Sequence, residues 1–479
     1  MPEYEFEIHG LRSIGGRLSG RATVRFIEVP DPPIEPPPTV DLGGYRPQMV
    51  SAFGMDSVGG RGPGGIIPVV IRMNSLADTV GSTLSGPTGA GTISNPFVYT
   101  GQLGAALLHN TPRFIVPEVS GYINIARQLR ITNPYFTVAG QTAPGDGITV
   151  RCASGFGSDR GIYIATHNSV LQHFKIRPGS SSCNSALQYW NLDEVGHDIH
   201  HGLLDHMSIT WAQDEGIGYV YDVGTSAIWR SIIAETLYGT PGSEICSGGG
   251  FSSGHGLAIG TGNDIAILQN LIAHNLERNP QIDGGSSGAI QNNVFYSPKP
   301  GPWLNILNGQ TFKWRMDGNY FKRDSIFQSA ETYAFRVMNA VAGSQLYLND
   351  NFIDNGNVLQ PIQLFRSTGG IDPRVGTVPA GTTVPGYTPL TSAATFPFVL
   401  SNAGARPLNR DVIDTRIVQS VQNRTGNYVS QVSEVGGYPT ITLQTNTFQM
   451  PANPMAVGDS KGRLNIELYL EQLARNLEP

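Results

Sequence analysis

Charged side chains are scarce in this sequence. Of its 479 residues, 14% are Asp, Glu, Lys or Arg, whereas an average soluble protein has about 25%. The net charge is −6 and the Lys and Arg residues form no cluster, which excludes the basic surface that nucleic-acid-binding proteins need. A polyanionic ligand would therefore need local cations or a metal ion.

Long apolar runs are absent as well. No stretch approaches 18 apolar residues, so we expect no membrane-spanning helix. The N-terminus mixes Glu and Arg without an apolar core of about seven residues, so the sequence predicts no classical secretory signal peptide.

Cysteine is rare too. Cys152, Cys183 and Cys246 cannot all pair, and their spacing has no CxxC zinc-binding pattern. We therefore expect buried free thiols, with at most one disulfide.

Turns and short apolar runs are plentiful, with 59 Gly and 33 Pro. An Asn followed by two apolar residues ends several of these runs, at Asn270, Asn293, Asn319 and Asn351. Such a repeat, without a helical apolar pattern, predicts stacked strands in a solenoid. Stacked Asn side chains suit the corners of a parallel β-helix, where they form a hydrogen-bonded ladder. The alternative is an antiparallel sandwich, which would need hairpin turns at closer intervals.

The ends of the chain differ from this pattern. Residues 1–29 predict a small N-terminal β element, with strands at 4–9 and 21–29, and the prolines of 30–42 predict a semi-rigid linker. Residues 43–479 would then form the solenoid with a C-terminal wrap-around tail. The β element is either a cap on the solenoid or a separate attachment module. We also expect a short helix at 464–477 that caps one end of the solenoid.

Three groups of polar residues accompany the expected strands, which include 206–211 and 227–233. The groups contain, in chain order, Asp205, His206, Asp214 and Glu215, then His255, then His274, Asn275 and Arg278. Residues one coil apart lie roughly 4.8 Å from each other in a stack of coils. Acids and bases that are distant in sequence can therefore meet on one face.

Five ordered segments resemble the pectate lyases of polysaccharide lyase family 1. They are AGQTAPGDGI at 139–148, LLDHMSITWAQDEG at 203–216, ERNPQIDGG at 277–285, VGGYP at 435–439 and LNIELYLEQL at 464–473. The resemblance extends from about residue 53 to residue 473. It implies an all-β fold, a right-handed parallel β-helix with a short C-terminal helical segment. It also implies cleavage of acidic polygalacturonan by β-elimination, usually with calcium (Ca²⁺).

The resemblance implies a catalytic role for two residues. Arg278 matches the arginine that removes the proton at C5 of a uronate, a proton made acidic by the neighbouring carboxylate and its bound cations. Guanidinium groups have a pKa above 12, so Arg278 needs further cations nearby to act as a base. Alternatively, Arg278 pairs with Glu277 or Asp283. His255 stands where the family has a lysine, and it is either an assisting proton carrier or a hydrogen-bonded turn residue.

The resemblance also implies metal and substrate contacts. The predicted metal ligands are Asn184, Asp214 and Glu215, and the predicted substrate contacts are His274, Asn275, Asp283 and Trp211. Asn184 and Tyr219 stand where the family has aspartates, and Asp283 replaces a substrate-binding arginine. Because calcium affinity follows the number of charged ligands, we expect weak calcium binding. Asp205 and His206 are expected to support the scaffold.

The sequence therefore predicts a polysaccharide lyase that acts on a uronate-containing glycan by metal-assisted β-elimination. Its partner would be an acidic polysaccharide, outside the cell or on a particle to which the N-terminal element attaches. One alternative is a virion tail-type adhesin that keeps the β-helix and binds glycans with little or no lyase activity. Another is a glycan hydrolase that uses paired carboxylates.

Overall fold

The computed structural model describes four short strands near the N-terminus and most of residues 52–479. The gaps in the second region are 155, 157–159, 180–184, 191–198, 240–253, 297–302, 306–309, 325–332 and 357–362. The chain divides into two compact units, Met1–Pro36 and Pro37–Pro479. The expected linker at 30–42 lies outside the described residues, so the predicted domain boundaries stay a prediction.

The N-terminal unit contains two antiparallel strand pairs. Strand β1 (Glu5–Glu7) pairs with β4 (Arg21–Thr23), and β2 (Arg12–Ser13) pairs with β3 (Gly16–Arg17). The expected strands at 4–9 and 21–29 are thus present in shorter form. The expected small N-terminal β element is confirmed.

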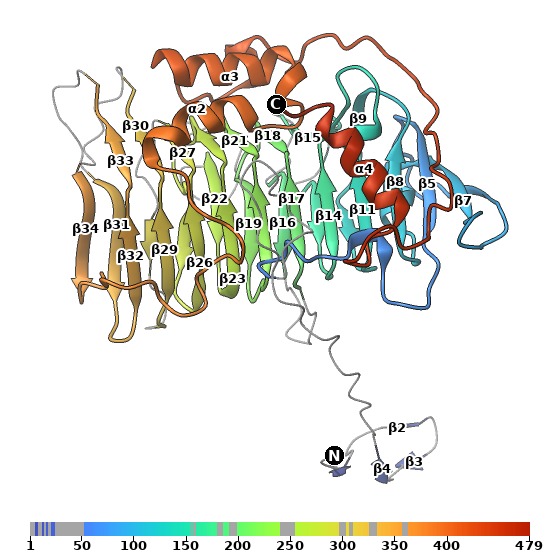
Figure 1. Ribbon diagram of the computed structural model, residues 1–479, viewed down its shortest axis with the longest axis horizontal. Coiled ribbons are helices and arrows are strands. Elements are labelled where there is room, and N and C mark those ends of the chain that lie inside the picture. Colours follow the sequence, from blue (N-terminus) through green and yellow to red (C-terminus); the bar gives the residue numbers. More distant parts are fainter. Residues whose placement is uncertain are drawn as a thin grey trace. The chain divides into compact units, whose positions relative to one another are not determined.

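The larger unit is a parallel β-helix in which each coil adds one strand to each of three sheets (Figure 1). Sheet I runs in the spatial order β32-β29-β26-β23-β20-β17-β14-β11-β8-β5-β7-β6, and only its last pair, β6 with β7, is antiparallel. Its strands are β5 (Val69–Ser75), β6 (Ser85–Thr88), β7 (Val98–Gln102), β8 (Arg113–Pro117), β11 (Phe136–Ala139), β14 (Ser169–Gln172), β17 (Gly202–Asp205), β20 (Ser226–Trp229), β23 (Gly262–Leu268), β26 (Ser286–Gln291), β29 (Lys313–Asp317) and β32 (Gln345–Asn349).

Sheets II and III are parallel throughout and contain nine strands each. Sheet II contains β9 (Gly121–Ile125), β12 (Ile148–Cys152), β15 (Lys175–Ile176), β18 (Ser208–Thr210), β21 (Ile232–Ala234), β24 (Leu271–Ala273), β27 (Val294–Tyr296), β30 (Tyr320–Lys322) and β33 (Phe352–Asp354). Sheet III contains β10 (Leu129–Ile131), β13 (Ile162–Ile164), β16 (Leu187–Trp190), β19 (Glu215–Val220), β22 (His255–Ile259), β25 (Gln281–Asp283), β28 (Trp303–Asn305), β31 (Tyr333–Ala340) and β34 (Gln363–Gly370). The predicted fold class is confirmed.

The expected asparagine ladder is also confirmed. Asn270 Nδ2 donates to Asn293 Oδ1 at 3.0 Å, Asn293 Nδ2 to Asn319 Oδ1 at 3.1 Å, and Asn319 Nδ2 to Asn351 Oδ1 at 2.8 Å. The same side chains bind backbone groups of the neighbouring coils. Buried polar groups that lose such partners are costly, so the ladder fixes the stacking register of these coils.

Replacing Asn293 with alanine should lower the free energy of unfolding by roughly 3 kcal/mol, because several buried donors and acceptors lose their partner at once. Chemical denaturation measures this loss. Asn351→Ala is the matched control, since Asn351 is half-buried at the end of the ladder and its side chain makes fewer hydrogen bonds than that of Asn293. Equal losses in the two variants would show that the ladder adds no stability beyond single hydrogen bonds.

Left-handed corners separate sheet I from sheet II. The stretch 227–233, expected as one strand, is split at Arg230, whose φ is +46°, into β20 and β21. His173 and His206 occupy the same corner in the two preceding coils, with φ values of +56° and +50°. This backbone conformation is unusual for residues other than glycine, and the apolar pattern of the strands does not reveal it.

The three short sides of each coil enclose one apolar core. Ile and Val from all three sheets fill it, joined near the last coils by stacked Phe295 and Phe321 at 4.8 Å. Helix α1 (Leu103–Leu107) contributes Leu103, Ala106 and Leu107 to this core and contacts β5, β7, β8 and β10. Helix α1 therefore covers the first coil, a role the sequence did not predict.

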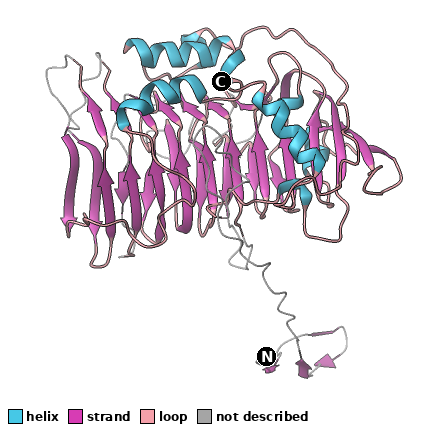
Figure 2. Ribbon diagram, in the orientation of Figure 1, coloured by secondary structure: helices cyan, strands magenta, loops and turns pink. Residues whose placement is uncertain are grey.

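The C-terminal segment packs along the outside of the coils and contains three helices, α2 (Ser392–Asn402), α3 (Val412–Asn423) and α4 (Asn465–Arg475). Helices α2 and α3 pack on the outer face of sheet II (Figure 2), through a cluster that includes Ile232, Leu271, Ile413 and Ile417. The short 3₁₀ helices of the larger unit are η2 (Gly59–Arg61), η3 (Gly140–Thr142), η5 (Pro407–Asn409) and η6 (Val432–Val435).

Helix α4 confirms the expected C-terminal helix, but its expected position was wrong. Its Ile466 and Leu470 pack against Val70, Phe114 and Val116 on the outer face of sheet I, beside the coils and not across their end. The reason is that strands β5 and β8 carry apolar residues on both faces, so the outer face also needs a cover.

An ion-pair network fastens helix α3 to the coils. Arg177, just after β15, is buried and donates from Nη1 to Asp411 Oδ2 at 2.6 Å and from Nη2 to Asp414 Oδ1 at 2.6 Å. Lys175 Nζ lies 3.0 Å from Asp411 Oδ2. Asp411 also caps the helix by accepting from the backbone N–H groups of Ile413 and Asp414.

The cysteines and the helices test two further expectations. Cys152 is disulfide-bonded, so the expectation of a free thiol is wrong at this position, and Cys183 and Cys246 lie outside the described residues. Within the described residues, none of the helices has both the length and the apolar character to span a membrane.

Candidate active site

The parallel register of sheet III brings four of the predicted site residues together. Glu215, the first residue of β19, is directly opposite His255, the first residue of β22. His255 in turn forms a parallel bridge to Glu277, the residue before Arg278, in the turn that leads to β25. Asp214 precedes Glu215. Residues separated by up to 64 positions therefore share the start of three neighbouring strands.

Asp214 and His255 form a hydrogen-bonded pair. His255 Nδ1 lies 2.8 Å from Asp214 Oδ1, and the backbone N–H of His255 donates to the Asp214 carbonyl at 3.1 Å. The Asp214 side chain is 38% exposed while that of His255 is 7% exposed. An imidazole that donates its Nδ1–H to a carboxylate is held in one orientation and has Nε2 as its basic nitrogen.

Glu215 is the buried acid of the site. Its Oε1 pairs with Arg278 Nη1, and its Oε2 accepts from Ser185 Oγ at 3.0 Å and from Gln188 Nε2 at 3.3 Å. Burial and the adjacent Asp214 carboxylate raise the pKa of Glu215 to about 7, although Arg278 acts in the opposite direction. Burial also tends to raise the pKa of Asp214, but hydrogen bonds from His255 and Glu215 outweigh it and the pKa of Asp214 is lowered.

Arg278 stands on a turn that its neighbours hold in place. Its φ is +55° and its side chain is 31% exposed. The backbone N–H of Leu257 donates to the Arg278 carbonyl at 2.7 Å. Asn275 and Asn279 hydrogen-bond each other at 3.1 Å, side chain to side chain and side chain to backbone. The guanidinium is therefore presented to solvent from a fixed backbone.

The donor set is compatible with a calcium ion at Asp214 and Glu215. Both carboxylates offer the hard oxygen ligands that calcium prefers, and they lie close enough to share a hydrogen bond, so that a cation can replace the shared proton. Two other expected positions do not add ligands. Tyr219 is fully buried in the coil core against Tyr189, and Asn184 lies outside the described residues.

Three predicted substrate contacts lie elsewhere. His274 is buried, with Nε2 2.7 Å from Ser420 Oγ beneath helix α3, and burial lowers its pKa to about 4. Trp211 is buried, donates to Glu235 Oε2 at 3.1 Å and meets the Tyr438 ring edge to face. Asn275 is buried within the turn of Arg278. All three side chains hold the turn or the C-terminal tail.

Asp283 is near Arg278 and so belongs to the surroundings of the site. It ends β25, in the same coil as Arg278, and is partly exposed. Burial raises the pKa of Asp283, while Gln281 and the Arg278 charge act against this rise. A half-buried acid in this position can bind a hydroxyl group, whereas it would repel a uronate carboxylate.

Sequence reasoning missed Ser185, Gln188 and Gly256. The first two support Glu215 from the preceding coil, and they become visible only when the register of β16 with β19 is known. A side chain at Gly256 would come within 2.7 Å of Asn275 Nδ2 and Asn279 Oδ1. Only glycine therefore lets the Arg278 turn pack against β22.

Comparisons with known proteins place the chain among relatives of similar length. No protein-family model matches the sequence. "Probable pectate lyase C" of Aspergillus oryzae is 26% identical over 405 residues, which cover 80% of this chain and 79% of that protein. "Probable pectate lyase C" of Neosartorya fischeri is 27% identical over 399 residues, covering 81% and 80%.

Among solved structures, jun a 1, the major allergen from cedar pollen, is similar with a TM-score of 0.46 and 12% identity, covering 74% of this chain and 92% of that one. These relatives in sequence match about four-fifths of the chain. They confirm the predicted resemblance, and the chain is a pectate lyase-like enzyme built on a parallel β-helix.

Proposed function

We propose that the chain cleaves a uronate-containing, pectate-like glycan by β-elimination at the site formed by Asp214, Glu215, His255 and Arg278. The observation that carries this proposal is the register of sheet III, which aligns a base, an assisting histidine and two carboxylates at the start of three neighbouring strands. The substrate class comes from the resemblance to proteins named pectate lyase.

The elimination needs a group that removes the C5 proton of a uronate. The C–H electron pair then forms the C4=C5 double bond, and the bond between C4 and the glycosidic oxygen breaks. In the proposal Arg278, neutral before the reaction, takes the C5 proton, and His255, protonated on both ring nitrogens, gives the Nε2 proton to the departing oxygen. The hydrogen bond from His255 Nδ1 to Asp214 keeps the imidazole oriented for this transfer.

Glu215 controls whether Arg278 can act as a base. The ion pair between the two side chains stabilises the protonated guanidinium, which opposes loss of its proton. Neutralising the Glu215 carboxylate, by a proton or by a cation, removes this opposition. A calcium ion held by Asp214 and Glu215 would supply positive charge that makes the C5 proton more acidic.

The C-terminal tail leaves sheet III as the face for a long substrate. Apolar clusters cover the outer faces of sheets I and II and join them to the tail or to residues 52–55. Among the described residues, none of these three clusters covers the outer face of sheet III. Aligned positions beside the site carry Gln188, Gly218, Ala258 and Gln281. Small and polar side chains in register suit an extended sugar chain. Such a polymer is met outside the cell, where we expect the protein to act.

Incubation with polygalacturonate, methylated pectin and other uronate polysaccharides tests the proposal, with and without a chelator. The new double bond next to a carboxylate absorbs ultraviolet light, whereas hydrolysis and simple binding create no such absorbance. We expect rising absorbance with polygalacturonate and a slower rise after chelation. New reducing ends without absorbance would identify a hydrolase, and binding without any cleavage would identify an adhesin.

The raised pKa of Glu215 predicts a pH dependence of calcium binding. A group whose pKa is about 7 holds its proton below that pH and must release it to bind the cation. Calcium should therefore bind about tenfold more weakly at pH 6 than at pH 8, because one proton competes with the ion. Calorimetric titration at the two pH values measures the difference. Glu215→Gln should abolish it, Asp283→Asn should preserve it, and a pH-independent affinity would remove Glu215 from the ligand set.

A further inference from the structure

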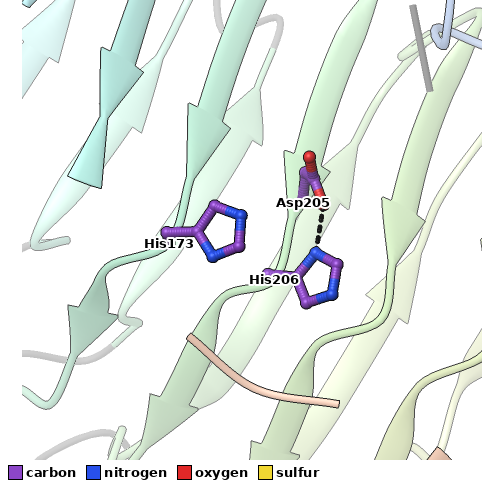
Figure 3. Close-up of side chains that lie close together, drawn as sticks. All are labelled: His173, Asp205 and His206. Carbon is purple, nitrogen blue, oxygen red and sulfur yellow. Dashed lines mark hydrogen bonds and ion pairs between the residues drawn. The ribbon is translucent and has the colours of Figure 1, made fainter. Parts of the chain in front are cut away.

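A second group of ionisable side chains lies far from this site, at the corner between sheets I and II. His173 and His206 follow β14 and β17 in neighbouring coils, and neither side chain is exposed. Their rings are stacked at 4.8 Å with an angle of 10° between the planes (Figure 3). Asp205, the residue before His206, is also buried.

The C-terminal tail completes the group with Glu478. Glu478 is 4% exposed, and its Oε1 lies 3.3 Å from His173 Nε2 and 4.0 Å from His206 Nδ1. Asp205 Oδ1 lies 2.6 Å from His206 Nδ1. One nitrogen or oxygen from each of His173, Asp205 and His206 lies within 4.8 Å of the others. Atoms of His173, Asp205 and His206 therefore converge, and Glu478 Oε1 lies beside both imidazoles.

Further partners orient His173, Asp205 and Glu478, whereas His206 Nε2 is buried without a hydrogen bond within the described residues. His173 Nδ1 donates to the Ala405 carbonyl at 2.9 Å. Gln172 Nε2 donates to Asp205 Oδ2 at 2.7 Å. Arg230 Nη1 lies 3.8 Å from Glu478 Oε2. Metal-binding side chains are commonly held in this way. A hydrogen bond to one polar atom of the side chain orients the other polar atom, which binds the ion.

Burial and charge also favour a cation in the group. His173 Nε2 is buried and makes no hydrogen bond within the described residues. Burial lowers the pKa of His206, which outweighs the nearby carboxylates and favours the neutral imidazole that a metal needs. Two carboxylates face two imidazoles, with the Arg230 guanidinium at their edge. Buried charges of this kind need compensation, and a divalent ion supplies it.

We propose that His173, Asp205, His206 and Glu478 bind one zinc ion (Zn²⁺) that joins the C-terminal tail to the coils. Tetrahedral zinc, with bonds of about 2.0–2.1 Å, places its ligand atoms about 3.3 Å apart, and the three separations of 2.6, 3.3 and 4.0 Å bracket this value. Four protein ligands in a buried place make a closed, structural site. Mixed nitrogen and oxygen ligands select zinc over calcium, which prefers oxygen alone.

The metal content of the purified full-length chain tests this proposal directly. We expect about one zinc per chain after mild dialysis, and a visible absorption typical of tetrahedral cobalt when Co²⁺ replaces zinc in the chelated protein. Zinc should still bind in a Glu215→Gln/His255→Asn variant, in which the other group of possible ligands is dismantled. Absence of zinc, and of the cobalt spectrum on titration of the folded chain, would overturn the proposal.

Variants then show which residues hold the ion. Glu478→Gln and His173→Gln keep similar shape and should each weaken zinc binding at least about a hundredfold. A chelator should lower the melting temperature of the natural chain and speed proteolysis of the tail after helix α4, but it should change neither in these variants. Equal zinc affinity in the variants and the natural chain would contradict the assignment. If the variants fail to fold, the cobalt spectrum of the natural chain still shows whether the chain has a tetrahedral metal site.

Discussion

Replacing Arg278 with alanine should lower kcat/KM on polygalacturonate about a thousandfold, the range expected when a general acid–base group is removed. The loss should appear in kcat, because the guanidinium acts on the proton that moves in the transition state. Arg278→Lys should fail as well, since one ammonium group cannot reproduce both the ion pair with Glu215 and the contact with the substrate. Initial rates of ultraviolet absorbance measure these losses.

The controls for this prediction separate chemistry from folding. Arg374→Ala removes an arginine that is similarly paired, with Asp372, but lies outside the site, and its activity should be unchanged. Arg278 already has a left-handed φ of +55°, and alanine adds no backbone cost there because both residues carry the Cβ atom that causes it. A melting curve should therefore show a folded protein. A folded Arg278→Ala protein with full activity would exclude Arg278 as the base and leave His255 as the candidate.

Replacing Arg177 with methionine should lower the free energy of unfolding by about 3–5 kcal/mol, because buried Asp414 would lose its cation and buried Asp411 would keep only Lys175. In the natural chain, burial tends to raise the pKa of Asp411, but Arg177 and Lys175 hold that pKa far below its usual value. Removing Arg177 therefore withdraws the main compensation for a buried charge. Denaturation in guanidinium chloride measures the change.

Arg374→Met is the matched control for this loss of stability. Arg374 and Asp372 form an ion pair of similar geometry, with side chains that are 54% and 48% exposed, and exposed pairs contribute about 0–1 kcal/mol. Limited proteolysis should show early cleavage around helix α3 in the Arg177→Met protein alone. If the free energy of unfolding falls by the same small amount in both variants, then the ion pairs of Arg177 do not fasten helix α3 to sheet II.

The sequence identified the architecture because one physical pattern repeats in it. Asn270, Asn293, Asn319 and Asn351 recur where a coil turns, and a ladder of amide side chains requires that spacing. The corners at His173, His206 and Arg230 were not predictable in the same way. A left-handed residue leaves no mark on the apolar pattern, so the stretch 227–233 was predicted as one strand and is two.

The candidate site was predictable in part. The resemblance singled out Asp214, Glu215, His255 and Arg278, and the structure brings these four together. It could not show that Glu215 pairs with Arg278, since that contact spans 63 positions and follows from strand register. His274 and Trp211 were predicted to bind substrate, but they face the C-terminal tail.

The sequence by itself therefore determined the repeat, the asparagine ladder, the resemblance to pectate lyases and the residues of the candidate site. Each of these depends on residue types at fixed local spacing. Only the tertiary structure decided which faces the tail covers, which acid pairs with the arginine, and that Glu478 meets His173 and His206. Those contacts join residues tens to hundreds of positions apart, and their pairing is set by how the coils stack and how the tail returns across them.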